Sequence, residues 1–123
     1  ILIKDNHIDF CGGVKNAINK CKNYIDQKKL DIKLVIEARN LSEVKQIINL
    51  GGINRIILDN FTINKTKKAL MLINKKFEVE SSGNINIKNI SNYADCGVDY
   101  ISVGALTHSI NNFDLSLISS YKI

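Results

Sequence analysis

Polar and glycine residues recur directly behind short apolar runs in this chain. Five such runs occur, and the segments behind them are Lys4-Asp5-Asn6-His7, Glu37-Ala38-Arg39, Asp59-Asn60, Glu80-Ser81-Ser82-Gly83-Asn84 and Gly104-Ala105-Leu106-Thr107-His108. If the runs are parallel strands, these segments follow carboxyl ends that meet at one edge of a sheet, where ligands of parallel α/β folds bind. The sequence therefore predicts one site built from five strand ends.

Two carboxylates at this edge are candidates for charge chemistry. Glu37 and Asp59 follow neighbouring strands, which predicts that they lie at the same level. Taken singly, each could be a helix N-terminal acid that complements the dipole. As a pair they would repel each other unless a cation lies between them. A metal, a lysine or another cationic group could supply that charge, and Mg²⁺ with the hydroxyls of a sugar phosphate would be suitable because that ion prefers oxygen ligands. Lys4, directly behind a predicted buried strand, is a further candidate, although it could also be an ordinary surface lysine.

Two glycine segments predict a cradle for an anion. Ser82-Gly83-Asn84 is expected to open a helix, and Val103-Gly104-Ala105 ends the last apolar run. Backbone N–H groups that no side chain shields can bind phosphate there, and barrel enzymes often hold phosphate at their last two strand ends. The alternative is that both glycines serve only tight turns.

The histidines and cysteines are less informative. His108 lies behind the second glycine segment and could contact a phosphate, whereas His7 could hydrogen-bond a neighbouring loop; either could also be structural only. Cys11, Cys21 and Cys96 are widely spaced without a C-x-x-C motif, which argues against a zinc site or a disulfide framework. No Ser-His-Asp order, H-E-x-x-H motif or Walker loop occurs.

Alternating strands and helices must position these groups. The predicted strands are Ile1–Ile3, Leu34–Ile36, Ile56–Leu58, Phe77–Val79 and Tyr100–Val103. Between them, apolar residues at helical spacing form four faces: Val14, Ala17, Ile18, Cys21 and Ile25; Val44, Ile47 and Ile48; Ile63, Ala69, Leu70 and Ile73; and Ile87, Ile90 and Ala94. Cap signals are Asn40 with Glu43, Thr62, Gly51 and Gly97.

This order predicts an α/β fold with a parallel sheet and right-handed crossovers. The sheet could be open and doubly wound or part of a barrel, and five units would leave an eight-stranded barrel incomplete. The 123 residues are expected to form one domain. The chain starts with Ile1 inside an apolar run, so we expect it to be a fragment or a processed product.

Composition narrows the class of protein. The hydrophobic fraction of 45% and charged fraction of 24% are typical of a globular domain. The net charge of +5 comes with dispersed lysines that no aromatic residues interleave, which favours solvated helix faces over nucleic-acid binding. No apolar stretch approaches the roughly 18 to 20 residues that cross a bilayer, so no membrane partner is expected and the cytoplasm is the expected location.

Longer stretches around the strand ends carry a family pattern. They are Ile3-Lys4-Asp5-Asn6-His7-Ile8, Glu37 with Leu41, Ile57-Leu58-Asp59-Asn60, Glu80-Ser81-Ser82-Gly83-Asn84-Ile85 and Gly97-Val98-Asp99-Tyr100-Ile101-Ser102-Val103-Gly104-Ala105-Leu106-Thr107-His108-Ser109. In this order they resemble the successive motifs of the quinolinate phosphoribosyltransferases, and the resemblance covers essentially the whole chain.

The resemblance implies a fold and a reaction. Residues 1–123 would be the C-terminal part of an incomplete (β/α) barrel, without the family's N-terminal capping domain and first barrel strands. The implied enzyme is a nicotinate-nucleotide diphosphorylase (carboxylating), a pentosyltransferase of NAD biosynthesis. It converts quinolinate and phosphoribosyl pyrophosphate (PRPP) into nicotinate mononucleotide, pyrophosphate and CO₂ with Mg²⁺, and it is expected to form a homodimer or a higher homo-oligomer.

The resemblance also implies roles for individual residues. Lys4 would lie near the quinolinate carboxylate and the pyrophosphate. Glu37 and Asp59 would face the ribose hydroxyls and the metal, and would stabilise positive charge on the sugar as pyrophosphate leaves. The residues that match the family's 5-phosphate region are Ser82, Gly83, Asn84, Val103, Gly104, Ala105 and His108.

The chain departs from the family pattern where quinolinate is held. The arginines and the histidine that hold the dicarboxylate in the family have no counterpart, because Arg39 and Arg55 match neither position. The implied site is a half site, and the chain alone is expected to be inactive. Two alternatives remain: a related molybdenum-linked phosphoribosyltransferase-like barrel protein, and a non-catalytic phosphate-binding fragment.

Overall fold

A single parallel sheet forms the centre of the molecule in the computed structural model, which describes residues 1–109 and 114–121. Its strands are β1 (Leu2–Ile3), β2 (Val35–Ala38), β3 (Arg55–Asp59), β4 (Glu78–Ser82) and β5 (Tyr100–Ile101). The helices are α1 (Asp5–Phe10), α2 (Val14–Lys28), α3 (Leu41–Leu50), α4 (Ile63–Ile73), α5 (Ile90–Ala94) and α6 (Ala105–His108). Residues 114–121 contain neither helix nor strand.

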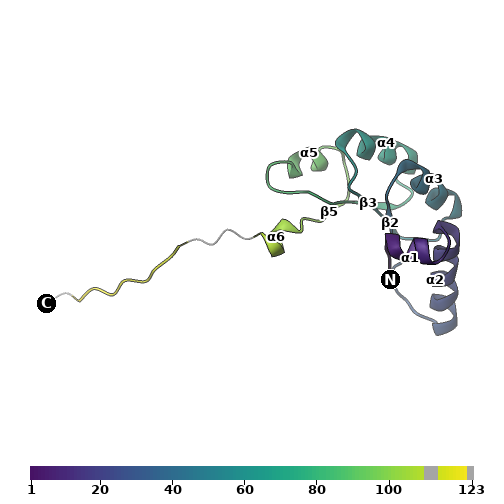
Figure 1. The fold of residues 1–123 in the computed structure, drawn as a ribbon, viewed down its shortest axis with the longest axis horizontal. Coiled ribbons are helices and arrows are strands. Elements are labelled where there is room, and N and C mark those ends of the chain that lie inside the picture. The colour runs from purple at the N-terminus through teal and green to yellow at the C-terminus, as the bar shows by residue number, and fades with distance from the viewer. Residues whose placement is uncertain (110–113, 122–123) are drawn as a thin grey trace.

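The strand order distinguishes between the two architectures. The strands are hydrogen-bonded in chain order, β1-β2-β3-β4-β5, and every neighbouring pair is parallel. Figure 1 shows α3, α4 and α5 along the same side of the sheet. A doubly wound sheet reverses its strand order and carries helices on both faces, whereas a barrel repeats one crossover in one direction. The prediction of five parallel strands in part of a barrel is therefore confirmed.

All five strands have boundaries that differ from the predicted ones: β1 begins at Leu2, and β3 extends from Arg55 to Asp59, one residue further at each end. β2 and β4 run further toward the carboxyl edge than the apolar runs, so that Glu37 and Glu80 lie inside strands, and β5 ends at Ile101 rather than Val103. In β4 the three central residues, Val79, Glu80 and Ser81, are buried, whereas Glu78 and Ser82 at its two ends remain partly accessible. The ladder can continue through polar residues because only every second side chain meets the helices.

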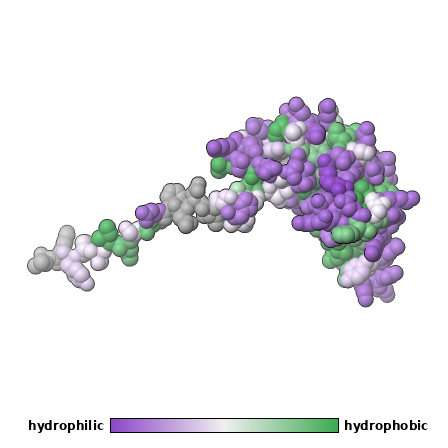
Figure 2. Space-filling view, in the orientation of Figure 1, coloured by the Kyte–Doolittle hydropathy of each residue, from purple (hydrophilic) through white to green (hydrophobic). Residues whose placement is uncertain are grey.

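The core lies between the sheet and the helices. Its fully buried large residues include Ile3, Ile18, Ile36, Val44, Ile47, Ile56, Leu58, Ile73 and Val79. The predicted apolar faces of α2, α3 and α4 all supply buried residues to this cluster. In the view of Figure 2, hydrophilic side chains cover much of the helical layer, as expected for lysines on solvated faces.

The last predicted helical face is wrong. Ile87 is 91% exposed and precedes α5, which begins only at Ile90 and buries none of its side chains. Residues 86–89 form a turn instead, in which Asn89 Oδ1 accepts the N–H of Asn86 at 2.8 Å and Asn86 Oδ1 accepts the N–H of Lys88 at 2.9 Å. Asparagine side chains that bond the nearby backbone compete with helix formation.

Local cap signals were mostly correct. Asn40 Oδ1 accepts the Glu43 N–H at 3.0 Å, Thr62 Oγ1 accepts the Lys65 N–H at 3.4 Å, and Gly51 ends α3. Gly97, by contrast, lies beyond α5, whose C-cap is Asp95.

One edge of the sheet is apolar and accessible. Ile1 and Leu2 are 38% and 39% exposed, and with Phe10 and Tyr24 they line a hollow of about 650 Å³ beside β1. Within the described residues, β1 pairs only with β2.

Among the described helices, none combines the length and the apolar character that crossing a bilayer requires.

Candidate functional site

The loops behind β3, β4 and β5 are drawn together at the carboxyl edge of the sheet. Asp59 is in register with Ser82, and beyond the strand the Asn60 N–H donates to the Ser82 carbonyl at 2.8 Å. On the other side of β4, the Ser102 N–H donates to the Ser81 carbonyl at 3.0 Å. These bonds extend the ladder past the regular strands and hold the loops side by side.

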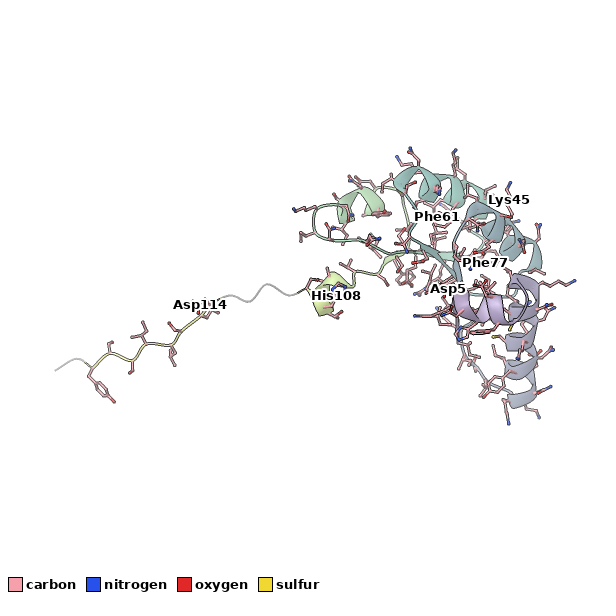
Figure 3. The ribbon with its side chains drawn as sticks, in the orientation of Figure 1. Asp5, Lys45, Phe61, Phe77, His108 and Asp114 are labelled. Carbon is pink, nitrogen blue, oxygen red and sulfur yellow. The ribbon has the colours of Figure 1, made fainter. Side chains whose placement is uncertain are left out.

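A hollow of about 700 Å³ opens between the last two of these loops. Its walls include Ser82, Gly83, Asn84, Ser102, Gly104, Ala105 and His108. Six of the seven residues predicted for phosphate binding therefore meet in one place, and only Val103 is absent from the walls. In Figure 3, His108 lies in α6, below the strands, whereas α3 and α4 lie above them.

The predicted helix opening at Ser82-Gly83-Asn84 is wrong. Gly83 and Asn84 adopt φ values of 90° and 53°, and successive left-handed residues cannot begin a right-handed helix. The segment is a turn whose backbone N–H groups, without a helix dipole, remain suited to an anion. Gly104 does precede a helix, and its carbonyl accepts the N–H groups of Thr107 and His108 at 2.9 and 3.2 Å.

The two glycines of the hollow are required for different reasons. At Gly83 the φ of 90° disfavours any side chain, and a Cβ atom would lie 2.9 Å from the Asn60 backbone nitrogen. At Gly104 the backbone is ordinary, but a Cβ atom would lie 2.9 Å from His108 Nε2. The Gly83 contact involves backbone, so it cannot be relieved by a simple side-chain rotation.

Glu37 and Asp59 share a face of the sheet but not a level. Glu37 is in register with Ile57, which precedes Asp59 by two residues on β3. The two carboxylates therefore lie on one face with a stagger, and the expectation of equal level is wrong. Such a stagger is a general property of parallel strands that close toward a barrel.

The surroundings of Glu37 disfavour its ionised form. Burial is the largest influence and raises the pKa of Glu37; Asp59 adds to this effect, while the Asp5 backbone N–H and the Lys4 charge oppose it. The charge of Lys4 therefore favours the ionised form of Glu37, although the two residues form no ion pair in the described part of the chain. Within the described residues, no ion pair involves Glu37 or Asp59.

His7 holds the backbone from which Lys4 projects. Its Nδ1 atom accepts the Lys4 N–H at 2.9 Å, and Lys4 is the exposed N-cap residue of α1. Figure 3 shows Asp5, the next residue, at the start of this helix. His7 therefore stabilises the local conformation of its own segment.

Sequence reasoning missed a charged network below the site. Arg55 Nη1 lies 3.0 Å from Glu80 Oε2, its Nη2 lies 3.0 Å from Glu78 Oε2, and its guanidinium is 3.6 Å from the centre of the Tyr100 ring. Ser102 Oγ donates a further hydrogen bond to Glu80. Glu80 is buried, and its carboxylate has an ion-pair partner in Arg55. Glu37 and Asp59 are then the two site carboxylates that form no ion pair within the described residues.

Asn60 was also missed as a site residue. Its Nδ2 donates to Asp59 Oδ2 at 3.0 Å, and its Oδ1 accepts from Asn84 Nδ2 at 2.9 Å. The sequence signal was the asparagine that follows the strand-end acid, but its partner lies 24 residues away.

Glu37 and Asp59 are suited to hold a magnesium ion whose other ligands are water and oxygen atoms of a substrate. Among the described residues, no three side chains of the kinds that bind metals converge. Mg²⁺ usually takes only one or two carboxylates and completes its shell with water and phosphate oxygens. Glu37 and Asp59, which form no ion pair in the part of the chain that the structure describes, fit that pattern.

Replacing Glu37 with glutamine is expected to raise the free energy of unfolding at neutral pH. Because the pKa of Glu37 is raised in the folded state, stability falls as the pH rises from the ordinary glutamate pKa through the raised value. Glutamine does not ionise, so its advantage should be present at neutral pH and disappear in acid, where Glu37 is protonated in both states. Urea unfolding of both proteins at neutral pH and near pH 4 checks this, and an equal gain at both values would contradict it.

The chain is similar to known proteins over most of its length. Residues 1–118 match the family profile described as quinolinate phosphoribosyl transferase, C-terminal domain. The chain is 37% identical over 131 residues to the nicotinate-nucleotide pyrophosphorylase (carboxylating), chloroplastic, of Arabidopsis thaliana, with 95% of this chain and 38% of that protein covered. It is also 37% identical to quinolinate phosphoribosyltransferase (decarboxylating) 1b of Nicotiana tabacum, with coverage of 95% and 37%.

Solved structures give the same relationship. The crystal structure of nicotinate-nucleotide pyrophosphorylase from Ehrlichia chaffeensis superposes with a TM-score of 0.83 and 39% identity, over 91% of this chain and 39% of that one. The corresponding protein of Francisella tularensis gives a TM-score of 0.80 and 36% identity, over 89% and 38%. The chain thus spans about two fifths of the length of these relatives.

Proposed function

We propose that this chain supplies the ribose- and phosphate-binding part of a nicotinate-nucleotide pyrophosphorylase (carboxylating). The chain belongs to the quinolinate phosphoribosyl transferase family, whose C-terminal domain it matches. The main support is the carboxyl edge of the sheet, which carries both a hollow lined by Gly83 and Gly104 and two carboxylates that form no ion pair among residues 1–109 and 114–121. The names of the relatives favour quinolinate, and none supports the molybdenum-linked alternative.

The proposed reaction is a pentosyl transfer of NAD biosynthesis. The ring nitrogen of quinolinate forms a bond to the C1 atom of the PRPP ribose while the bond from C1 to pyrophosphate breaks. Loss of one carboxylate as CO₂, with a proton taking its place on the ring, gives nicotinate mononucleotide. Positive charge grows on the sugar as pyrophosphate departs, so preplaced negative charge lowers the barrier.

Glu37 and Asp59 would provide that negative charge. Both lie on the same face of the sheet, and the stagger between β2 and β3 separates them along the strands. Two staggered carboxylates can face different atoms of one ribose. Lys4, whose charge lowers the pKa of Glu37, would bind the pyrophosphate and a quinolinate carboxylate. When bound by Glu37 and Asp59, Mg²⁺ would neutralise charge on the pyrophosphate.

The 5-phosphate of PRPP would bind in the hollow between the last two loops. The N–H groups of Gly83 and Gly104, the Ser82 hydroxyl and the amide of Asn84 are the proposed donors, and His108 closes the wall beside Gly104. The ribose and the 5-phosphate of PRPP would thereby be held on neighbouring loops, because Asp59 and Ser82 are paired in register.

The remaining elements of the proposal concern the rest of the enzyme. Quinolinate would be held largely by parts of the enzyme that have no counterpart in this chain. A homodimer or higher homo-oligomer would complete the site. The cytoplasm remains the proposed location, although two of the plant relatives are named as chloroplastic.

Formation of nicotinate mononucleotide tests the function directly. The full-length protein is incubated with PRPP, Mg²⁺ and quinolinate, and the product is measured by chromatography, with nicotinate in place of quinolinate as the matched control. We expect product and CO₂ from quinolinate alone. Product from nicotinate only, or phosphate binding without product, would contradict the proposal.

A further inference from the structure

We propose that Asn60 is a positioning residue that couples the Asp59 carboxylate to the phosphate-binding turn at Gly83 and Asn84. This inference rests on the proposed function of the same site and extends it. Asn60 belongs to neither group of predicted ligands, yet the structure places it between them. The side chain and the backbone of Asn60 make separate hydrogen bonds within the site.

The side chain of Asn60 joins the two parts of the site by two hydrogen bonds. Its Nδ2 donates to Asp59 Oδ2 at 3.0 Å, and its Oδ1 accepts from Asn84 Nδ2 at 2.9 Å. The series continues to Asn89, whose Nδ2 donates to the Asn84 carbonyl at 3.1 Å. One amide thus restricts the rotation of the acid and fixes the side chain of the turn.

The direction of these bonds is set by the acid. An ionised carboxylate only accepts hydrogen bonds, so the Asn60 amide must turn its NH₂ group toward Asp59. Its oxygen then faces Asn84, which must in turn present its own NH₂ group. Rotating either amide by half a turn would bring two acceptors or two donors together. The orientation of Asn84 therefore depends on the charge at Asp59.

The backbone of Asn60 supports the same turn. Asn60 has a φ of 55°, a left-handed conformation that asparagine tolerates better than most residues. In this conformation its N–H donates to the Ser82 carbonyl at 2.8 Å. The Asn60 side chain then occupies the space where a Cβ atom of Gly83 would lie. Asn60 and Gly83 therefore fit together as a pair.

The coupling has a consequence for the reaction. A phosphate held by the turn would order Asn84, and through Asn60 it would restrict Asp59 at the ribose. Binding energy from the non-reacting end of PRPP would then be used to orient a group at the reacting end. Loss of Asn60 should lower turnover as well as affinity, although Asn60 touches neither reacting atom.

Kinetics of the full-length protein test this role. Asn60→Gly keeps the left-handed backbone and removes the amide, and it is expected to lower kcat/KM for PRPP by about 10- to 100-fold, with a fall in kcat, because misplaced catalytic groups cost about that much. Asn74→Gly is the matched control, since Asn74 is also left-handed, at the end of α4 and remote from the site. Equal, small effects of both variants would overturn the proposal.

A double-mutant cycle separates coupling from general damage. If Asn60 and Asn84 act as a unit, Asn60→Gly combined with Asn84→Ala should lower kcat/KM by little more than the stronger single variant. Asn60→Gln supplies a rescue test, because it retains both amide groups and should recover part of kcat that Asn60→Gly loses. Additive losses in the cycle, or no recovery with glutamine, would overturn the coupling.

Phosphate titration by NMR tests the coupling without activity. Inorganic phosphate should shift the Gly83 backbone amide and, in the wild type, the Asn60 side-chain amide as well. In Asn84→Ala the Asn60 response should disappear. A response confined to the turn, or an Asn60 response that survives in Asn84→Ala, would overturn the proposal. Failure of the wild type to form nicotinate mononucleotide would instead contradict the proposed function, while the titration still reports on the coupling.

Discussion

Replacing Asp59 with asparagine is expected to lower kcat by about 100- to 1,000-fold, which is the loss that follows removal of one preorganised charge-stabilising group. Asp59 ends β3, is partly exposed, and forms no ion pair within the described residues. Its charge therefore contributes little to packing, and the free energy of unfolding should change by less than about 1 kcal/mol. Steady-state rates and urea unfolding of the full-length protein measure the two effects.

A carboxylate of the same sheet provides the control for this variant. Glu78 begins β4 at the opposite edge, and its hydrogen bond with Arg55 is the main cause of its lowered pKa. Glu78→Gln should weaken that ion pair and leave turnover nearly unchanged. If Asp59→Asn and Glu78→Gln lowered kcat equally, a general effect of charge would explain the result and the assigned role of Asp59 would be wrong.

Replacing Gly83 with alanine is the second variant with a large expected effect. The new Cβ atom would lie 2.9 Å from the Asn60 backbone nitrogen, so the turn or the Asn60 loop must move. The N–H groups proposed to bind phosphate belong to that turn, and we expect the affinity for PRPP to fall by roughly 100-fold, the order of the loss in rate that a displacement of about 1 Å causes in a positioned site. The φ of 90° adds a strain of about 1 to 3 kcal/mol.

Gly97→Ala separates the strain from the binding defect. Gly97 has a φ of 87°, close to that of Gly83, but a Cβ atom there would meet nothing within 4 Å. Both variants should therefore carry similar backbone strain, Gly83→Ala should lose further stability through its contact with Asn60, and only Gly83→Ala should lose PRPP affinity in calorimetric titration. A comparable loss of affinity in Gly97→Ala would indicate that reduced stability, and not the geometry of the turn, weakens binding.

Sequence patterns correctly predicted those helices and helix caps that form through interactions between residues close together in the chain. The apolar faces of α2, α3 and α4 followed from helical spacing, and the caps at Asn40 and Thr62 followed from side chains that bond the backbone three residues away. The two glycine segments at the strand ends were also singled out in advance, because glycine at a strand end has a direct conformational meaning. Their assembly into one hollow matched the expectation from parallel strands.

Features that depend on register were not accessible from one sequence. The stagger between Glu37 and Asp59 is a relation between β2 and β3, and neither strand encodes it alone. The Arg55–Glu80 ion pair joins residues 25 positions apart, so neither residue reveals its partner. The ends of β2, β3 and β4 were placed too early because hydropathy was used as the criterion, whereas the hydrogen-bond ladder of β4 continues through Glu80 to Ser82.

The sequential strand order also bears on how the chain loses its structure. Within the described residues, each strand pairs only with the strands immediately before and after it along the chain, so no ladder joins β1 to β5. In such a linear array, cooperativity passes from neighbour to neighbour, and local opening is easiest at the terminal units. β1 and β5, which pair over two residues each, should fray while β2, β3 and β4 stay intact. Lys4 and Gly104 follow those fraying strands, so the two ends of the site would be the first parts to lose their alignment.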